Sequence, residues 1–163
     1  MNLYAYCQNN PVMYYDPSVY VKLCPNGKTN SGDEGNGEKF GSGYTVNKER
    51  RTHILEGDEG VLGSGHGPNR NSVQGAFPDT WTDEQAIAAI ERVANDSDST
   101  WKQSTGPGYQ TAPVNVGGPS PDSPTVTNGG RDVRFIVRGQ DHGLEIEVIV
   151  EPGGEGIVTG YVK

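Results

Sequence analysis

Two runs of regularly spaced apolar residues near the C-terminal end constrain the fold of this chain more than any other feature. Val133, Phe135 and Val137 stand at every second position of the first run. The second run repeats this spacing at Leu144, Ile146, Val148 and Val150. A period of two puts the apolar side chains on one face of a strand. With GQDHG as the turn between them, and PGGEG leading into IVTGYV, the runs predict a three-stranded antiparallel meander with one polar face.

A helix is predicted ahead of this meander. Thr82 and Gln85 have the spacing of a capping box, and Asp83 and Glu84 suit the positive N-terminal end of a helix. The apolar residues that follow at helical spacing are Ala86, Ile87, Ala89, Ile90, Val93 and Ala94. The segment NDSDS then ends the helix. A helix followed by an antiparallel sheet predicts an α+β fold, with one main helix packed on a small antiparallel sheet.

The composition limits how much of the chain can be compact. Only 32% of the 163 residues are hydrophobic, and 24 are glycine and 11 proline. We therefore expect a compact part of roughly 100 residues, near the usual domain size, and loose segments beside it, including a loosely ordered N-terminal segment. Residues 21–52 are predicted to form a flexible linker, and residues 103–130 a long irregular loop with one short strand around YQTAPVNV.

The charge is unevenly distributed. The chain has a net charge of −8: six Lys and Arg against five Asp and Glu in residues 1–52 give +1, and seven against sixteen in residues 53–163 give −9. An acidic domain lacks the electrostatic footprint of a general nucleic-acid binder. Contact with nucleic acid would need a local basic patch, for which the candidates are Arg131, Arg134 and Arg138.

Membrane and disulfide classes are also disfavoured. No apolar run approaches the ~20 residues of a transmembrane helix, so we expect no membrane partner. The start MNLYAYCQNN has neither the basic nor the apolar region of a signal peptide, so export would depend on a carrier outside this sequence. Cys7 and Cys24 are too few for a disulfide framework or a tetrahedral metal site, and we interpret them as bystander thiols rather than one structural bridge.

His53, in THILEGDEG, and His66, in GSGHGPN, are the candidate catalytic residues. The unperturbed pKa of histidine, about 6.5, lets the side chain both accept and donate a proton near neutral pH. Two histidines that face one phosphodiester could divide the work without a metal. One would deprotonate the ribose 2′-OH, and the other would protonate the departing 5′-oxygen. A third polar or cationic group would stabilise charge on the phosphorane oxygens.

Other interpretations of the histidines stay open. His53 could instead cap a strand, and His66 could lie in a solvated loop. The two could also form a His–carboxylate metal site with the nearby acids Glu56, Asp58 and Glu59. No spacing here matches a helical H-x-x-x-H arrangement or a calcium loop, so we predict no metal ligands. His142, in GQDHG, is expected to be a turn residue.

The first 20 residues contain the segment NLYAYCQNNPVMYYDPS, followed by Val19. This segment resembles the end of the core domain of Rhs/YD-repeat proteins, whose pattern is NLYAYxxNNPVxYxDPSG, with Val19 where the family usually has glycine. In that family the motif ends a large shell that encloses a variable C-terminal toxin. The resemblance implies that residues 1–20 end an Rhs core and that a toxin-like module follows the linker.

Residues 53–163 resemble the bacterial EndoU nucleases. HILEGD, GSGH, FPDTW, a helical segment and IVTGY occur here in the family order. The resemblance implies an α+β domain of the EndoU type, with the architecture of the barnase, colicin and RelE-like toxin nucleases. It implies a metal-independent endoribonuclease without cofactors, which cleaves RNA (tRNA among the candidates) near uridines and leaves a 2′,3′-cyclic phosphate.

The two resemblances together imply the module of a polymorphic toxin. It would be secreted or delivered from a cell surface and would act in the cytoplasm of the target cell. The expected partners are the RNA substrate and a cognate immunity protein, and the expected state is a monomer.

The EndoU resemblance also implies roles for single residues. His53 and His66 match the acid–base pair, without showing which is the acid and which the base. Thr159 matches a threonine thought to contact the phosphate or the base of the substrate. Tyr161 matches a tyrosine thought to stack on the ribose or to orient it. Both could otherwise be ordinary strand residues.

Gln74 departs from the family pattern, which has a lysine at this position. Loss of one donor that stabilises the transition state typically lowers the rate ~10²–10³-fold. Arg70 on the same loop, Lys102 or an arginine of the sheet could supply the missing charge. Otherwise the chain would be a non-catalytic EndoU-like remnant that binds an immunity protein or RNA without cutting. In a further alternative it would be an extracellular binding module that shares only the fold.

Overall fold

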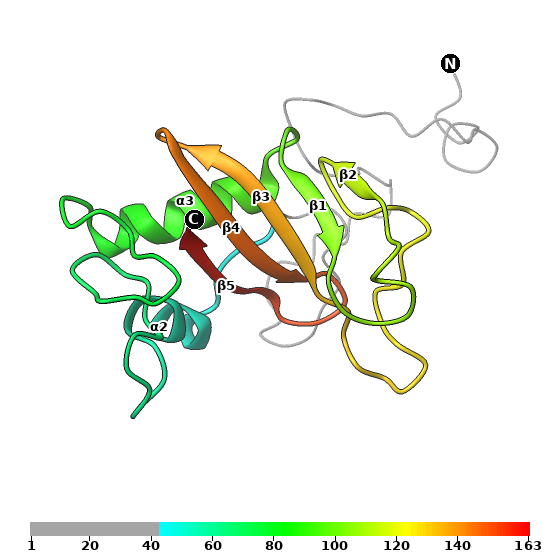
Figure 1. The fold of residues 1–163 in the computed structure, drawn as a ribbon, viewed down its shortest axis with the longest axis horizontal. Coiled ribbons are helices and arrows are strands. Elements are labelled where there is room, and N and C mark those ends of the chain that lie inside the picture. The colour runs from blue at the N-terminus through cyan, green and yellow to red at the C-terminus, as the bar shows by residue number, and fades with distance from the viewer. Residues whose placement is uncertain (1–42) are drawn as a thin grey trace, which may run out of the picture.

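The computed structural model describes residues 43–163. In this part of the chain, five strands form one antiparallel sheet in the order β2-β1-β3-β4-β5 (Figure 1). The strands are β1 (Thr100–Gln103), β2 (Val114–Val116), β3 (Phe135–Asp141), β4 (Leu144–Glu151) and β5 (Gly156–Val162). Two helices accompany the sheet, α2 (Lys48–Glu56) and α3 (Asp83–Asn95). The predicted α+β class and the β3–β4–β5 meander are confirmed, and the Rhs-like segment lies outside the described residues.

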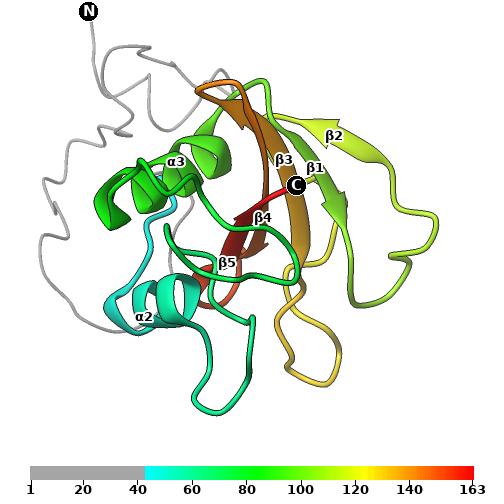
Figure 2. The same ribbon diagram turned by 60° about the vertical axis from the view of Figure 1, so that its left-hand side comes forward.

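Helix α3 forms where the sequence predicts it. The Thr82 hydroxyl accepts a hydrogen bond from the Gln85 amide at 3.3 Å, and the Gln85 side chain accepts one from the Thr82 amide at 2.8 Å. This capping box satisfies two backbone donors that the first turn leaves free. The helix packs across β3, β4 and β5, as Figures 1 and 2 show.

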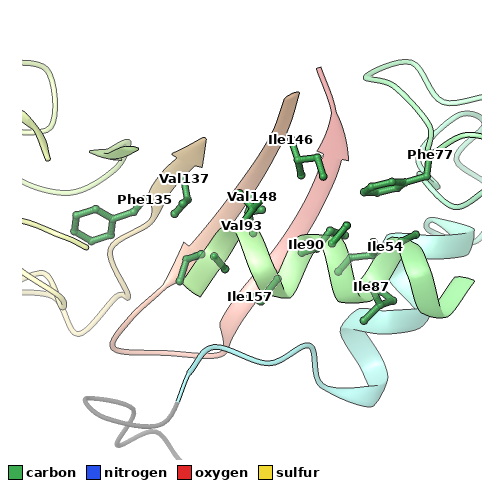
Figure 3. Close-up of a cluster of buried hydrophobic side chains, with 14 of the residues drawn as sticks. Ile54, Phe77, Ile87, Ile90, Val93, Phe135, Val137, Ile146, Val148 and Ile157 are labelled. Carbon is green, nitrogen blue, oxygen red and sulfur yellow. The ribbon is translucent and has the colours of Figure 1, made fainter. Parts of the chain in front are cut away.

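The core lies between α3 and the sheet. Figure 3 shows Ile90 and Val93 of α3 directed toward the buried side chains of β4 and β5. Alternate residues of β3 and β4, among them Val137, Ile146 and Val148, are fully buried on this face. Each such aliphatic side chain contributes about 1.5–3 kcal/mol by leaving water. This packing fixes β5, and therefore its opposite face, relative to the rest of the domain.

Helix α2 precedes the cleft and the sheet. It begins at Lys48, inside residues 21–52, which the sequence assigns to the linker. The Asn47 side chain caps it by accepting a hydrogen bond from the Arg50 amide at 2.8 Å. His53 lies in its last turn, so the alternative in which His53 caps a strand is wrong. Helix α2 packs against β5 (Figure 1).

The remaining strands lie at the far side of the sheet from β5. Strand β2 confirms the short strand expected around YQTAPVNV, whereas β1 was not predicted. Strand β1 pairs with both β2 and β3, and so carries the sheet beyond the meander. Within residues 43–163, no helix is long and apolar enough to cross a membrane.

Candidate active site

His66 is held by the C-terminal end of α2. The His66 amide donates to the carbonyl of Ile54 at 2.7 Å, and the Gly67 amide donates to the carbonyl of Leu55 at 3.1 Å. A Cβ at Gly65 or Gly67 would lie 2.8 Å from the Leu55 carbonyl oxygen. The glycines around His66 therefore let its backbone approach the helix closely. Because His66 is buried, the alternative in which it lies in a solvated loop is wrong.

The His66 ring is buried and anchored. His66 is only 4% exposed, and its Nδ1 lies 2.7 Å from the hydroxyl of Ser72. Burial is the main cause that lowers the pKa of His66, and the nearby His53 lowers it further, while a hydrogen bond at the Gly75 backbone opposes both. The ring therefore stays neutral to a lower pH than a free histidine.

His53 is anchored in the same way but by a charged partner. Its Nδ1 lies 2.7 Å from Asp58 Oδ1, so the pair becomes an ion pair when the ring is protonated. The loop itself positions Asp58, because the Asp58 amide donates to the Ser64 hydroxyl at 2.8 Å. Both histidines thus engage a neighbour through Nδ1, which leaves Nε2 of each ring without a partner among the described residues.

One open cleft joins four of the six predicted site residues, His53, His66, Gln74 and Thr159. It has a volume of about 350 Å³. It is lined by His53, Val61, Leu62, Gly63, Ser64, His66, Val73, Gln74 and Thr159. The cleft therefore brings both histidines together with a threonine from the far end of the sequence, and with Gln74.

Thr159 and Tyr161 lie on the face of β5 that points away from α3. Gly160 between them faces Ile90 of α3, and side chains alternate along a strand. The hydroxyl Oγ1 of Thr159 is buried and has no hydrogen-bond partner within residues 43–163. Tyr161 does not line the cleft, but its ring centroid lies 5.2 Å from that of His66. Its ring therefore forms part of the wall that holds His66.

The Tyr161 hydroxyl is fixed by an ionised network. It donates to Glu147 Oε1 at 2.6 Å, and Arg138 Nε donates to Glu147 Oε2 at 2.7 Å. Burial and the hydrogen bond to Glu147 raise the pKa of Tyr161 to about 12. Burial alone would raise the pKa of Glu147, but hydrogen bonds from Tyr161 and Arg138 lower it overall. Tyr161 is therefore a neutral, oriented group at physiological pH.

The residues that the sequence offered as a source of positive charge do not line this cleft. Arg70 is exposed and does not line the cleft. Lys102 lies on β1, with β3 and β4 between it and β5. Arg134 and Arg138 form ion pairs at 2.7 Å with the buried carboxylates of Glu151 and Glu147. Two of the three arginines of the candidate basic patch are therefore paired, whereas Arg131 is exposed.

The remaining candidates from the sequence are His142, a metal site and the two cysteines. His142 is in the turn between β3 and β4, as predicted, with a φ of 49° and its Nδ1 2.7 Å from Asp141 Oδ2. Among residues 43–163, no group of three or more His, Cys, Asp or Glu side chains is placed to hold a metal ion. Cys7 and Cys24 lie outside the described residues.

Three further residues support the site and were not assigned to it from the sequence. Asp58, considered there only as a metal ligand, contacts His53, while Ser72 contacts His66 and Glu147 contacts Tyr161. Asp58 follows the last turn of the helix that carries His53, a spacing that offers a local signal. Ser72 and Glu147 carry no such signal, because their contacts depend on the loop path and on strand register.

Comparisons of the chain with protein-family models, curated proteins and solved structures identify no match. The resemblances to EndoU nucleases and to Rhs cores therefore stay predictions. The geometry of the cleft is independent of them.

Proposed function

We propose that residues 43–163 form a metal-independent endoribonuclease domain of the EndoU type. The 2′-hydroxyl of the substrate would attack the adjacent phosphorus, the bond to the 5′-oxygen would break, and a 2′,3′-cyclic phosphate would remain. The observation that carries the proposal is the convergence of His53, His66 and Thr159 on one cleft. Both rings are anchored at Nδ1 there, which leaves both Nε2 atoms for the substrate.

The environments of the two histidines support different roles. His66, buried and with a lowered pKa, is the general base, because it is neutral near pH 7 and can accept the 2′-OH proton at Nε2. This requires the Nδ1 proton to be donated to Ser72 Oγ. His53 is the general acid, since Asp58 can balance the charge of its protonated ring. It gives its Nε2 proton to the departing 5′-oxygen.

Thr159 and Tyr161 would act on the substrate without exchanging protons. The unpartnered hydroxyl of Thr159 can donate to a phosphate oxygen or a base once the substrate fills the cleft. Tyr161, with its hydroxyl held by Glu147, packs its ring beside that of His66 and so orients the general base; a contact with the ribose rests on the EndoU resemblance. A preference for uridine rests on the EndoU resemblance.

The charge around the cleft favours one direction of approach for RNA. A second groove, of about 500 Å³, adjoins His53 on another side. Its lining residues are Glu49, Thr52, His53, Glu56, Gly57, Asp58 and Glu59. The four carboxylates would repel phosphates. The RNA strand is therefore expected to enter from the side of Gln74 and β5.

The biological setting is proposed from the Rhs-like motif in residues 1–20. The domain would be the toxin module of an Rhs-type polymorphic toxin, secreted or delivered from a cell surface into the cytoplasm of a target cell. A cognate immunity protein would block the cleft of the monomeric module in the producing cell.

A second candidate function is favoured by one observation. Gln74, where the EndoU resemblance implies a lysine, lines the cleft and carries no charge. A domain without any cation at the phosphate would bind RNA or an immunity protein without cutting.

The direct test is cleavage of total tRNA and of a uridine-containing oligoribonucleotide in excess EDTA. Wild-type protein is expected to cut both, and His53→Ala and His66→Ala are each expected to abolish cleavage. His142→Ala is the matched control, because His142 lies in the β3–β4 turn, and it should cut at the wild-type rate. Absence of cutting by the wild type would favour the non-catalytic alternative.

A further inference from the structure

The cleft lacks a cation at Gln74, and the end of β5 offers one. The loop that carries Gln74 touches the end of this strand, because a Cβ on Gly75 would collide with the carbonyl oxygen of Val162. Gln74 precedes Gly75 and Lys163 follows Val162. The loop that carries Gln74 and the end of β5 that carries Lys163 are therefore neighbours in the fold.

The side chain of Lys163 lies on the same face as the site residues of β5. Its amide donates to the Glu145 carbonyl at 2.9 Å, so the strand pairing continues through Lys163. By alternation, Thr159, Tyr161 and Lys163 share the face that points away from α3. The Lys163 ammonium confirms this placement, since it lies 3.8 Å from Glu147 Oε2, on the carboxylate that binds the Tyr161 hydroxyl.

Lys163 is held loosely, in contrast to Arg138. Its Nζ lies 3.9 Å from Glu145 and 3.8 Å from Glu147, both beyond hydrogen-bond distance. Arg138 is hydrogen-bonded to Glu147 at 2.7 Å. The Lys163 side chain is also 45% exposed. Because a lysine ammonium sits on a flexible four-carbon stem, it can leave these weak contacts for a stronger anion.

We infer that Lys163 binds the scissile phosphate in the cleft and supplies the positive charge that Gln74 lacks. The inference rests on the proposed nuclease function. On substrate binding, the ammonium moves from Glu145 and Glu147 past Tyr161 to a non-bridging phosphate oxygen. There it stabilises the charge that develops on the phosphorane. The network at Glu147 stays neutralised, because Arg138 remains bound to it.

The test compares single-turnover cleavage by Lys163→Gln with that by Lys48→Gln. Neither lysine lines the cleft in the described structure, but Lys48 is an exposed lysine at the start of α2 and not on the β5 face that carries Thr159, Tyr161 and Lys163. Lys163→Gln is expected to lower the rate constant of cleavage ~10²–10³-fold, whereas Lys48→Gln should leave it unchanged. Adding Gln74→Lys to Lys163→Gln should restore most of the rate, because residue 74 lines the cleft and a lysine there would supply the positive charge to the same phosphate.

Binding of an uncleavable oligonucleotide, with 2′-deoxyuridine at the cutting site, gives a second readout. Lys163→Gln should weaken this binding and reduce its dependence on salt concentration. Cleavage by the wild type together with an undiminished rate in Lys163→Gln would overturn this inference alone. Absence of cleavage by the wild type would overturn the nuclease function, and this inference with it.

Discussion

Replacing Asp58 by asparagine tests the proposed role of His53 as the general acid. The carboxylate lies 2.7 Å from His53 Nδ1, and the Asp58 side chain is 60% exposed. An exposed ion pair is worth at most about 1 kcal/mol. If this energy is lost from the transition state, the rate falls about fivefold, since 1.36 kcal/mol corresponds to a factor of ten. The folded state should lose no more than the same amount.

The assay is single-turnover cleavage of a uridine-containing oligoribonucleotide, with Glu59→Gln as the matched control. Glu59 is an acid of the same loop and is not hydrogen-bonded to His53. Asp58→Asn should slow cleavage about fivefold, and Glu59→Gln should change it little. Equal effects from both variants would mean that general electrostatics, and not the contact with His53, governs the rate, and would refute the assignment.

Three further predictions concern pH and packing. Because burial lowers the pKa of His66, the unfolded state binds more protons than the folded state between this pKa and about 6.5. The free energy of unfolding should therefore fall as the pH drops through this interval, and His66→Gln should remove this dependence. The acid limb of kcat/KM should lie below about pH 6.5. Tyr161→Phe leaves Glu147 Oε1 without its donor and should lower the free energy of unfolding in urea by about 1–3 kcal/mol, while Tyr109→Phe at an exposed site should not. In Gly160→Ala the new Cβ would lie 2.8 Å from Ile90 Cγ1, so about 1–3 kcal/mol of stability should be lost; Gly118→Ala, which meets no atom within 4 Å, is the control, and equal stability of the two would contradict the described packing.

The elements that the sequence predicts are those with complete local signals. Helix α3 has a capping box at Thr82 and an apolar stripe that is buried along its length. Strands β3 and β4 alternate and are joined by a short turn at His142. In these elements the local pattern and the tertiary packing require the same conformation.

The elements that the sequence does not predict depend on partners far away along the chain. Strand β1 is only four residues long, and its neighbour β3 begins more than thirty residues later. Helix α2 buries only Ile54 and Leu55, so its sequence shows no apolar period, and its stability comes from contact with β5. Such pairings are decided by the assembled fold rather than by the local sequence.

The candidate site likewise combines residues that the sequence can identify with contacts that it cannot. His53 and His66 can be selected from the sequence by their chemistry. The contact between Tyr161 and Glu147 depends on the register of β4 and β5, which shifts between Ile149 and Val150. Periodicity gives the face of a strand but not its register. Sequence reasoning therefore finds the groups that would react, and the fold is needed to find those that hold them.

The most direct test of the account is the chemical structure of the RNA ends after cleavage in EDTA. Mass spectrometry of a cut uridine-containing oligoribonucleotide should show a 2′,3′-cyclic phosphate on the upstream fragment and a 5′-hydroxyl on the downstream fragment, and neither should form with His53→Ala or His66→Ala. Intact RNA with the wild type, or fragments that end in a 3′-hydroxyl and a 5′-phosphate, would contradict the assignment of the two histidines as a transesterifying acid–base pair.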